Sequence, residues 1–287
     1  MILDGHIHII SLSTDHAGFA GNLREAGIEG GIVMSLPPPA FPAVAPSAPP
    51  LARVRNVLDW SKASPGLYPF FWIDPLEPDA IEQVAMAIGQ GIMGFKVICD
   101  RYYPGDERAL SVFRAIAGNG RPILFHSGIL WDGKPSSRFN RPAEFEPLLE
   151  VKGLRFSLAH IAWPWCDELV AVYGKFLNAQ AGKAADGVEM FIDTTPGTPP
   201  IYRKDALTKL FTIGYDVDSN VIFGTDGRTD GYNVAWARQW IERDNLIFEE
   251  LGLDGKTVRG IFADNLKRFV GLSSGAAQRK APRPGES

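Results

Sequence analysis

Met1-Ile-Leu-Asp-Gly-His-Ile-His-Ile-Ile10 is an apolar stretch that carries two histidines at alternate positions, His6 and His8. In a β-strand, residues i and i+2 point to the same face, so both imidazoles can approach one ion. The whole chain has only five histidines. Taken alone, the pair could equally be satisfied by backbone hydrogen bonds. The positions of the other histidines therefore decide between the two interpretations.

Apolar runs with strand character recur along the chain, and stretches with helical periodicity separate them. Several runs are continuously apolar, which is typical of strands buried on both faces of a parallel sheet. Eight such units in succession predict an α/β protein with a (β/α)8 TIM barrel, regular or distorted, whose active site lies at the C-terminal ends of the strands. The expected strands are residues 2–9, 30–36, 68–74, 91–98, 122–127, 155–161, 188–194 and 220–225, and the expected helices are residues 52–63, 80–89, 107–119, 143–151, 166–178, 203–215 and 235–251.

The domain organisation follows from length and composition. A doubly wound open sheet would need a phosphate-binding Gly-X-Gly-X-X-Gly after the first strand, and the sequence has none there. The 287 residues suffice for one barrel. We therefore expect one barrel domain over residues 1–273. Residues 274–287, rich in Ala, Pro, Gly and charge, are expected to form a disordered tail.

Composition excludes several classes of partner. The net charge of −4 argues against a nucleic-acid backbone or an anionic membrane. No apolar run approaches the roughly 20 residues that span a bilayer, and no signal peptide is visible. The two cysteines, Cys99 and Cys166, form no Cys-X-X-Cys pair, which favours a reducing, cytoplasmic location.

Polar residues also stand at the ends of other expected strands. Lys96 lies near the end of the fourth strand, His126 and His160 end the fifth and sixth, and Asp226 follows the eighth. Each has an ordinary explanation alone, as a hydrogen-bonded strand end, a turn residue or a lysine that reaches water. In a barrel, however, these positions converge on one axis with the first-strand histidines. Imidazole and carboxylate ligands of this mix suit Zn²⁺, or less selectively Mn²⁺, Fe²⁺ or Co²⁺.

These motifs resemble the amidohydrolase superfamily, in its amidohydrolase-related (amidohydrolase 2) branch of TIM-barrel metal-dependent hydrolases and decarboxylases. That branch also contains aminocarboxymuconate-semialdehyde and resorcylate decarboxylases. The resemblance covers nearly the whole chain. It is carried by Asp4-Gly-His-Ile-His8, Gly94-Phe-Lys96, Phe125-His-Ser-Gly128, Leu158-Ala-His-Ile161, Phe223-Gly-Thr-Asp226 and the closing segment Ile261-Phe-Ala-Asp-Asn-Leu-Lys-Arg-Phe-Val-Gly-Leu272.

The resemblance implies roles for these residues. The metal ligands would be His6, His8, His126 and Asp226, binding one divalent ion, Zn²⁺ by preference. Asp226 and His160 would be catalytic, Asp226 by accepting a proton from water and His160 by polarising the substrate or passing a proton to the leaving group. Lys96 and His160 could instead serve a second metal, with Lys96 carboxylated, or contact the substrate. We expect one metal ion.

Arginines and tryptophans in the expected catalytic loops are candidates for substrate binding. Arginine pairs bidentately with carboxylates, and tryptophan can form a flat wall for a ring or lactone. Each of them alone is also typical of a solvated charge or of loop packing. The candidates are Arg138, Arg141, Arg228, Trp131 and Trp163, with Arg101 and Trp165 nearby. The expected partner is a small carboxylate-bearing molecule, and a homo-oligomer remains open.

The Pro-rich segment of residues 37–50 holds seven prolines in fourteen residues. Such a segment cannot be a helix or a central strand. It is either a stiff cover over one end of the barrel or a flexible surface loop, and we favour the cover, because loops that leave the C-terminal ends of strands surround the active site in this fold.

Three functions are open at this point. The resemblance implies a metal-dependent hydrolase that attacks a small acid-bearing ester, lactone or amide with a metal-activated water. Within the same family, the alternative is a non-oxidative decarboxylase of an aromatic or enoic carboxylic acid. A catalytically silent barrel that binds a small ligand is the alternative from another class, and it would need a missing metal ligand, whereas every expected position is filled.

Overall fold

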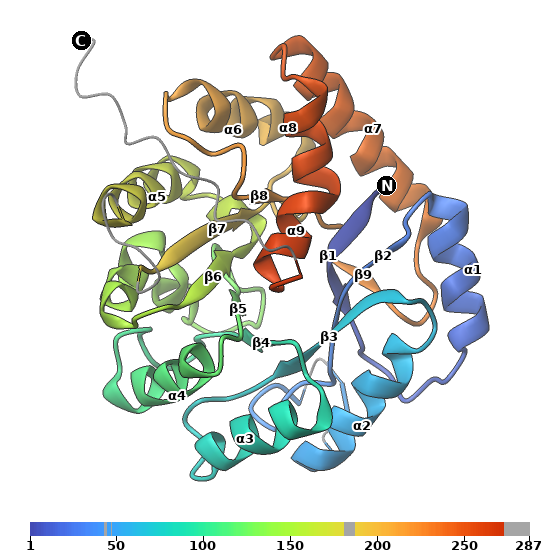
Figure 1. Cartoon of the computed structure of the whole chain (residues 1–287), viewed down its shortest axis with the longest axis vertical. Coiled ribbons are helices and arrows are strands. Elements are labelled where there is room, and N and C mark those ends of the chain that lie inside the picture. The colour runs from blue at the N-terminus through green and yellow to red at the C-terminus, as the bar shows by residue number, and fades with distance from the viewer. Residues whose placement is uncertain (43–44, 47, 181–186, 273–287) are drawn as a thin grey trace.

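Helices surround a parallel sheet in the computed structural model of the chain, which describes residues 1–42, 45–46, 48–180 and 187–272 (Figure 1). Within these residues the sheet has nine strands in the order β8-β7-β6-β5-β4-β3-β2-β1-β9, and neighbouring strands pair in parallel. The strands are β1 (Leu3–His8), β2 (Gly30–Met34), β3 (Gly66–Trp72), β4 (Gly94–Val97), β5 (Ile123–Phe125), β6 (Arg155–Leu158), β7 (Glu189–Asp193), β8 (Val221–Ile222) and β9 (Gly227–Arg228).

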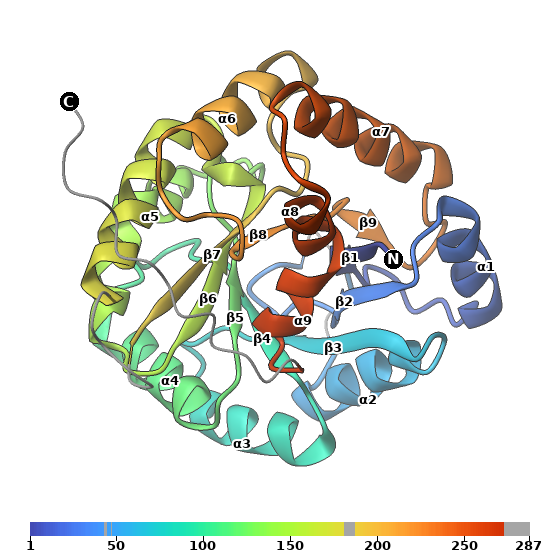
Figure 2. The ribbon, with the colours of Figure 1, turned by 45° about the horizontal axis from the view of Figure 1, so that its top comes forward.

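The longer helices form a ring around this sheet, and the C-terminal helices lie across its centre (Figure 2). The ring comprises α1 (His16–Ala26), α2 (Pro50–Ser61), α3 (Ala80–Gln90), α4 (Glu107–Gly118), α5 (Cys166–Gln180), α6 (Pro200–Thr212) and α7 (Val234–Glu250). Three 3₁₀ segments, η1 (Ser137–Asn140), η2 (Pro142–Glu150) and η3 (Ala159–Ala162), flank β6. The chain then continues through α8 (Gly255–Arg259), the π-helical η4 (Gly260–Asp264) and α9 (Asn265–Phe269).

The core divides along the two faces of the sheet. The largest cluster of buried apolar side chains joins the strands to the surrounding helices. On the other face, strand side chains pack against the segment η4–α9, so the C-terminal helices close that end of the molecule. This second cluster includes Leu3, Phe70, Leu124, Phe191, Leu266 and Phe269. The opposite end of the sheet, where the strands finish, is left for loops.

The predicted α/β class and strand–helix alternation are confirmed. The strand expected at residues 220–225 is instead divided, because β8 pairs with β7 while β9 pairs with β1. The residues between them also contact β1, since Gly5 N donates to Phe223 O at 2.9 Å. The short segment from β8 to β9 thus contacts β7 on one side of the sheet and β1 on the other. Closure into a full (β/α)8 barrel remains a prediction.

Two helices differ from expectation. Helix α1 was not predicted, because its apolar pattern is sparse, but Asp15 caps its start and Gly27, at φ 78°, ends it. The helix predicted at residues 143–151 is the 3₁₀ segment η2. Pro147 lies inside it and has no N–H to donate, which disfavours a regular α-helix.

Two buried arginines attach helices to strand ends. Arg53 of α2 donates to Trp72 O at 2.7 Å. Arg203 of α6 binds Asp244 of α7 through two hydrogen bonds, of 2.9 and 2.6 Å, and also donates to Thr194 O just after β7. These contacts fix helices of the ring against the end of the sheet at which the polar residues gather.

Among the residues described, none of the helices combines the length and hydropathy needed to cross a bilayer. The tail predicted at residues 274–287 lies outside the described residues. The cytoplasmic location and the domain boundary at residue 273 remain predictions.

Candidate metal and substrate site

A cavity of about 650 Å³ opens among the C-terminal ends of the strands. All six polar residues singled out at the strand ends line it: His6, His8, Lys96, His126, His160 and Asp226. They come from β1, β4, the ends of β5 and β6, and the segment between β8 and β9. Positions up to 220 residues apart in sequence therefore meet in one cavity because parallel strands all end at the same edge.

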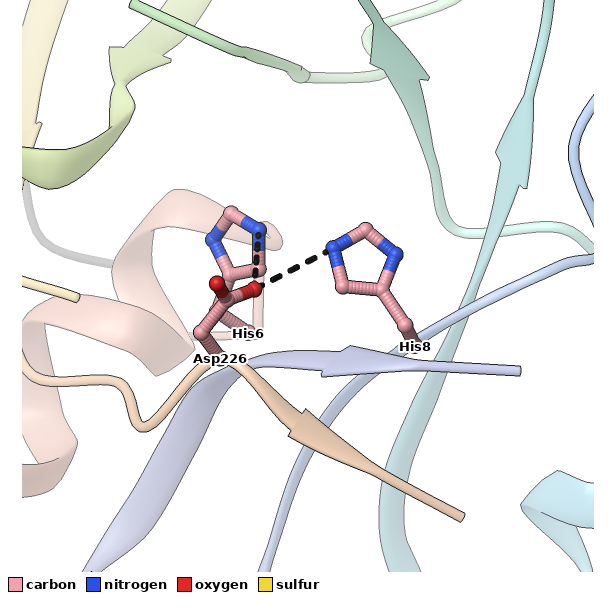
Figure 3. Close-up of side chains that lie close together, drawn as sticks. All are labelled: His6, His8 and Asp226. Atoms are coloured by element: carbon pink, nitrogen blue, oxygen red, sulfur yellow. Dashed lines mark ion pairs between the residues drawn. The ribbon is translucent and has the colours of Figure 1, made fainter. Parts of the chain in front are cut away.

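Three of these residues bring potential ligand atoms together (Figure 3). The donor atoms of His6, His8 and Asp226 all lie within 4.8 Å of one another. Asp226 Oδ1 is 3.4 Å from His8 Nε2 and 3.7 Å from His6 Nε2. Both histidines project from the same face of β1, as the alternation of the first strand predicts. Asp226 reaches them from a left-handed backbone position, at φ 56°, that non-glycine residues adopt infrequently.

The buried carboxylate of Asp4 fixes the position of β1 relative to the segment that carries Asp226. Asp4 Oδ1 accepts hydrogen bonds from His6 N at 3.0 Å and from Thr225 N at 2.9 Å. Its Oδ2 accepts from Thr225 Oγ1 at 2.5 Å and from Tyr232 OH at 2.7 Å. Burial raises the pKa of Asp4 to about 6, although these hydrogen bonds act to lower it. Asp4 thus ties β1 to the residue that precedes Asp226.

The four imidazoles of the cavity form a continuous series. The ring centroids are 5.1 Å apart for His8 and His6, 5.3 Å for His6 and His160, and 5.0 Å for His160 and His126. Burial lowers the pKa of His6 and His126 well below the usual value and that of His160 to about 4. These three rings are therefore neutral at pH 7 and can offer lone pairs or N–H groups.

His126 differs from the other predicted metal ligands. Its Nε2 lies 3.2 Å from Ile129 O, within hydrogen-bond distance, and it is not part of the three-residue group described above. The structure therefore places His126 in the cavity wall, beside His160.

His160 starts a strained turn. His160, Ile161 and Ala162 have positive φ values of 64°, 46° and 49°. Such conformations cost about 1–3 kcal/mol each and persist where surrounding structure imposes them. A β-carbon at Gly197 would lie only 2.7 Å from His160 Cβ, so a glycine is needed beside it. The turn directs the His160 ring into the cavity, where it contacts His6 and His126.

Charged groups complete the floor of the cavity. Lys96 is buried, and its Nζ lies 3.4 Å from His6 Nε2. Burial lowers the pKa of Lys96 to about 8, and the nearby Asp193 and Asp226 partly counter that effect. For Asp226, burial acts to raise the pKa, but the hydrogen bond from His8 and the electrostatic interactions with His6 and His160 hold it well below its usual value. Asp226 is therefore a carboxylate at neutral pH.

Asp193 is a further residue of the site, which the sequence patterns did not single out. It ends β7, is fully buried, and its Oδ2 lies 2.7 Å from His6 Nδ1. Its position could have been recognised, because it follows the apolar run Met190–Ile192 just as the other polar residues follow theirs.

The predicted substrate-binding residues divide into two groups. Trp131, Trp163 and Arg228 line the cavity. Arg141 instead pairs with Glu168 at 2.6 Å, and Arg138 lies over the ring of Phe139 and faces a separate surface depression that Arg101 also lines.

Loop geometry explains why Arg138 and Arg141 do not line the cavity. Gly128 N donates to Asn140 O at 3.0 Å, and the Asn140 side chain donates to Cys99 O at 2.8 Å. These bonds close the loop after β5 and fix its far end outside the cavity.

An apolar wall that the sequence analysis did not identify faces the cavity. Phe41, Trp72, Ile98 and Leu130 form a small cluster of their own, and all four line the cavity. The Phe41 and Trp72 rings are 5.1 Å apart, and Trp72 lies 5.8 Å from the His8 ring. Phe41 belongs to the Pro-rich segment, so the described part of that segment borders the site. Residues 43, 44 and 47 lie outside the described residues.

Comparisons with known proteins identify the fold. A scan against models of known families finds no match, and a search of curated proteins finds none either. Among solved structures, 2,6-dihydroxybenzoate decarboxylase from Rhizobium is similar with a TM-score of 0.59 and 14% identity, over 94% of this chain and 99% of that chain. An amidohydrolase 2 from Bifidobacterium longum subsp. infantis has a TM-score of 0.56 and 14% identity, over 95% and 99%.

A third solved structure is an amidohydrolase from Burkholderia ambifaria with bound Zn. Its TM-score is 0.50 and its identity 15%, over 87% of this chain and 66% of that chain. At these identities the likeness establishes the fold, which this chain shares with amidohydrolases and a decarboxylase.

Proposed function

We propose that this protein is a metal-dependent enzyme of the amidohydrolase superfamily, in its amidohydrolase-related branch, that hydrolyses a small acid-bearing ester, lactone or amide. One observation carries the proposal. His6, His8 and Asp226 gather their donor atoms within 4.8 Å at the floor of a cavity. The fold is shared with amidohydrolases, one of which contains bound Zn.

The donor set fits a divalent metal ion. Ligands must bind metal in deprotonated form, as neutral imidazole or as carboxylate. His6 is neutral because burial lowers its pKa, and Asp226 is ionised because its pKa lies well below the usual value. Two imidazoles and one carboxylate are a ligand set of catalytic zinc sites. We propose one ion, Zn²⁺ by preference, with Mn²⁺, Fe²⁺ or Co²⁺ as alternatives.

His126 is the proposed fourth ligand. Binding through Nδ1 would keep its contact with Ile129 O, whereas binding through Nε2 would break it. A second ion, with Lys96 carboxylated, is less favoured, because the Lys96 amine lies 3.4 Å from His6 Nε2, the nitrogen proposed to bind the first ion.

The residues around the donor set have roles that follow from their protonation states. A divalent cation held there would supply Lewis-acid activation of water or of a substrate carbonyl. Asp226 is the carboxylate placed to accept a proton from an attacking water. His160, neutral at pH 7, can donate an N–H to a substrate oxygen and so stabilise the charge that develops on it.

We expect the substrate to be recognised by the Arg228 guanidinium and by the apolar wall that includes Phe41 and Trp72. Arg228 pairs in register with His8 across β9 and β1, and it lines the cavity. Asp226, the carboxylate of the cavity, pairs with His6 and His8, and none of the described carboxylates forms an ion pair with Arg228, so the guanidinium is available for a substrate carboxylate. Phe41 and Trp72 would hold the apolar part of the substrate.

A non-oxidative decarboxylase is the second candidate. The aromatic wall of Phe41 and Trp72 suits an aromatic or enoic acid, and the fold is shared with 2,6-dihydroxybenzoate decarboxylase. In that case Arg228 and His160 would hold the substrate carboxylate and Asp226 would manage proton delivery to carbon.

The experiment combines metal analysis with a substrate screen. Protein purified without chelator is expected to contain about one equivalent of metal, and the zinc-loaded protein should hydrolyse members of a panel of acidic esters, lactones and amides. Release of CO₂ from carboxylated substrates, without consumption of water, would select the decarboxylase instead. Protein that is metal-free and indifferent to added Zn²⁺, Mn²⁺, Fe²⁺ and Co²⁺ would leave only the silent binding barrel.

A further inference from the structure

Asp193 is held in place by several donors at the end of β7. Its Oδ1 accepts hydrogen bonds from Thr195 N at 2.6 Å and from Thr195 Oγ1. Its Oδ2 is 2.7 Å from His6 Nδ1, and both side chains are fully buried. A carboxylate fixed by two donors of its own loop thus contacts the nitrogen of His6 that faces away from Asp226.

Two other imidazoles in the cavity lack such a partner. Among the described residues, the buried Nδ1 atoms of His8 and His160 have no hydrogen-bond partner. His6 therefore has a carboxylate partner for its Nδ1, whereas His8 on the same strand has no hydrogen-bond partner for its Nδ1. When Nδ1 carries the proton and donates it to a carboxylate, Nε2 keeps its lone pair and becomes a better ligand.

The end of the neighbouring strand β8 packs tightly against Asp193, Thr195 and His6. A β-carbon at Gly224 would lie 2.3 Å from Thr195 Oγ1 and 3.0 Å from His6 Cβ. Only a glycine allows the segment after β8 to pass this close. This packing leaves Thr195 and His6 little room to move. The contact of Asp193 with His6 is therefore fixed both by the Thr195 hydrogen bonds and by the segment that contains Gly224.

We propose that Asp193 is a positioning residue that fixes the tautomer and ring orientation of His6, so that Nε2 is presented to the metal ion. The proposal rests on the proposed metal site, and it assigns to β7 a contribution that acts through β1. Asp193 itself would not contact the ion.

The first test reads the tautomer in the metal-free protein. Nitrogen-15 NMR of histidine-labelled protein, with His6 assigned by comparison with His6→Gln, should show His6 protonated on Nδ1 and bare on Nε2. Asp193→Ala should lose this preference. Asp193→Asn should retain much of it, because the amide oxygen still accepts a hydrogen bond.

The second test measures zinc affinity by competition with a chelator. Loss of an outer partner of a metal-bound histidine weakens metal binding 10- to 100-fold, and we expect that loss for Asp193→Ala, with a smaller one for Asp193→Asn. Asp74→Asn is the matched control, because Asp74 is a buried carboxylate after β3 that binds Arg101. It should leave zinc affinity within about twofold.

The outcomes separate the two proposals. A wild-type protein that binds zinc but shows His6 protonated on Nε2 overturns the role of Asp193 and leaves the metal site standing. The same holds if Asp193→Ala binds zinc as tightly as the wild type. Should Asp193→Ala not fold, the wild-type tautomer and the Asp193→Asn affinity still decide. A wild-type protein that binds no metal overturns the proposed function, whatever the tautomer shows.

Discussion

Asp4 and Thr225 are separated by 221 residues in sequence, and the Asp4 carboxylate accepts hydrogen bonds from both the backbone N–H and the hydroxyl of Thr225. This relationship joins the strand that carries His6 and His8 to the residue before Asp226. The segments that carry His6, His8 and Asp226, three of the four proposed ligands, are thus joined by one buried carboxylate that does not itself line the cavity. Stability and metal binding should therefore be coupled through Asp4.

Substituting Asp4 tests that coupling. In Asp4→Asn, the amide nitrogen would face donors that the carboxylate now accepts from, leaving at least one buried polar group unpaired, which costs about 1–3 kcal/mol. Urea unfolding should show this loss, and zinc affinity should fall with it. Tyr232→Phe, which removes a single donor, should cost about 1 kcal/mol or a little more. Equal stability of Asp4→Asn and wild type would contradict the role of Asp4.

Zinc should stabilise the folded protein, and removing a ligand should abolish the effect. A ligand that binds only the folded state at 100 times its Kd adds about 2.7 kcal/mol, so the thermal midpoint should rise on zinc addition and fall back with chelator. His8→Gln and His126→Ala should lose this response. His16→Gln is the matched control, since His16 lies against Trp60 with ring centroids 4.5 Å apart, and not in the cavity. A zinc response that survives in His8→Gln would speak against the proposed ligands.

Arg228 and Arg138 should differ in their effect on substrate binding. Because Arg228 lines the cavity and Arg138 does not, Arg228→Met should raise KM for an acid-bearing substrate about tenfold or more, the value of a hydrogen bond to a charged group. Arg138→Met should leave KM unchanged. Steady-state kinetics on the substrate found in the screen would measure both. A raised KM for Arg138→Met with an unchanged KM for Arg228→Met would instead indicate that the loop after β5 binds the substrate.

The pair of Arg203 and Asp244 should dominate the stability of the link between α6 and α7. Both side chains are fully buried, so removing one partner leaves an uncompensated charge and costs about 3–5 kcal/mol. Arg203→Met should lower the free energy of unfolding by this amount in urea. Adding Asp244→Leu to that variant should recover part of the loss. A single variant as stable as the wild type would show that the pair contributes little.

The two thiols should react slowly. Burial raises the pKa of Cys166 to about 11, with the nearby Asp167 acting in the same direction, and burial raises the pKa of Cys99 further. Since the thiolate is the reactive form, alkylation of Cys166 at pH 8 should be roughly a hundredfold slower than that of a free cysteine and should accelerate as the pH rises. Mass spectrometry over time would follow it. Cys99 should react only after unfolding, and rapid labelling of either thiol at pH 8 would contradict this.

Much of the candidate site could be predicted without coordinates. The alternation of His6 and His8 in an apolar strand, and the placement of His126, His160 and Asp226 at the ends of others, follow from strand periodicity and from the rule that parallel strands end at one edge. Those residues do line one cavity. Their roles as ligands and catalytic groups remain proposals.

The misses have local causes. Helix α1 has few apolar positions, so its cap at Asp15 and its terminating Gly27 carried more information than its periodicity. Arg138 and Arg141 lie in a loop whose course depends on the bond from Gly128 to Asn140, which no local pattern reveals. Phe41 lies in a Pro-rich segment without strand or helix periodicity, so the sequence does not indicate its contact with Trp72.

The sequence by itself determined the α/β class, most of the alternation of strands and helices, and the strand ends at which polar residues stand, because these depend on periodicity along a single segment. Only the tertiary structure decided which of those residues touch. The bonds of Asp193 to His6 and of Asp4 to Thr225, and the choice of Arg228 over Arg138, arise between segments far apart in the chain. Such contacts depend on how the whole sheet packs with its helices, and the periodicity of side chains within one segment does not predict them.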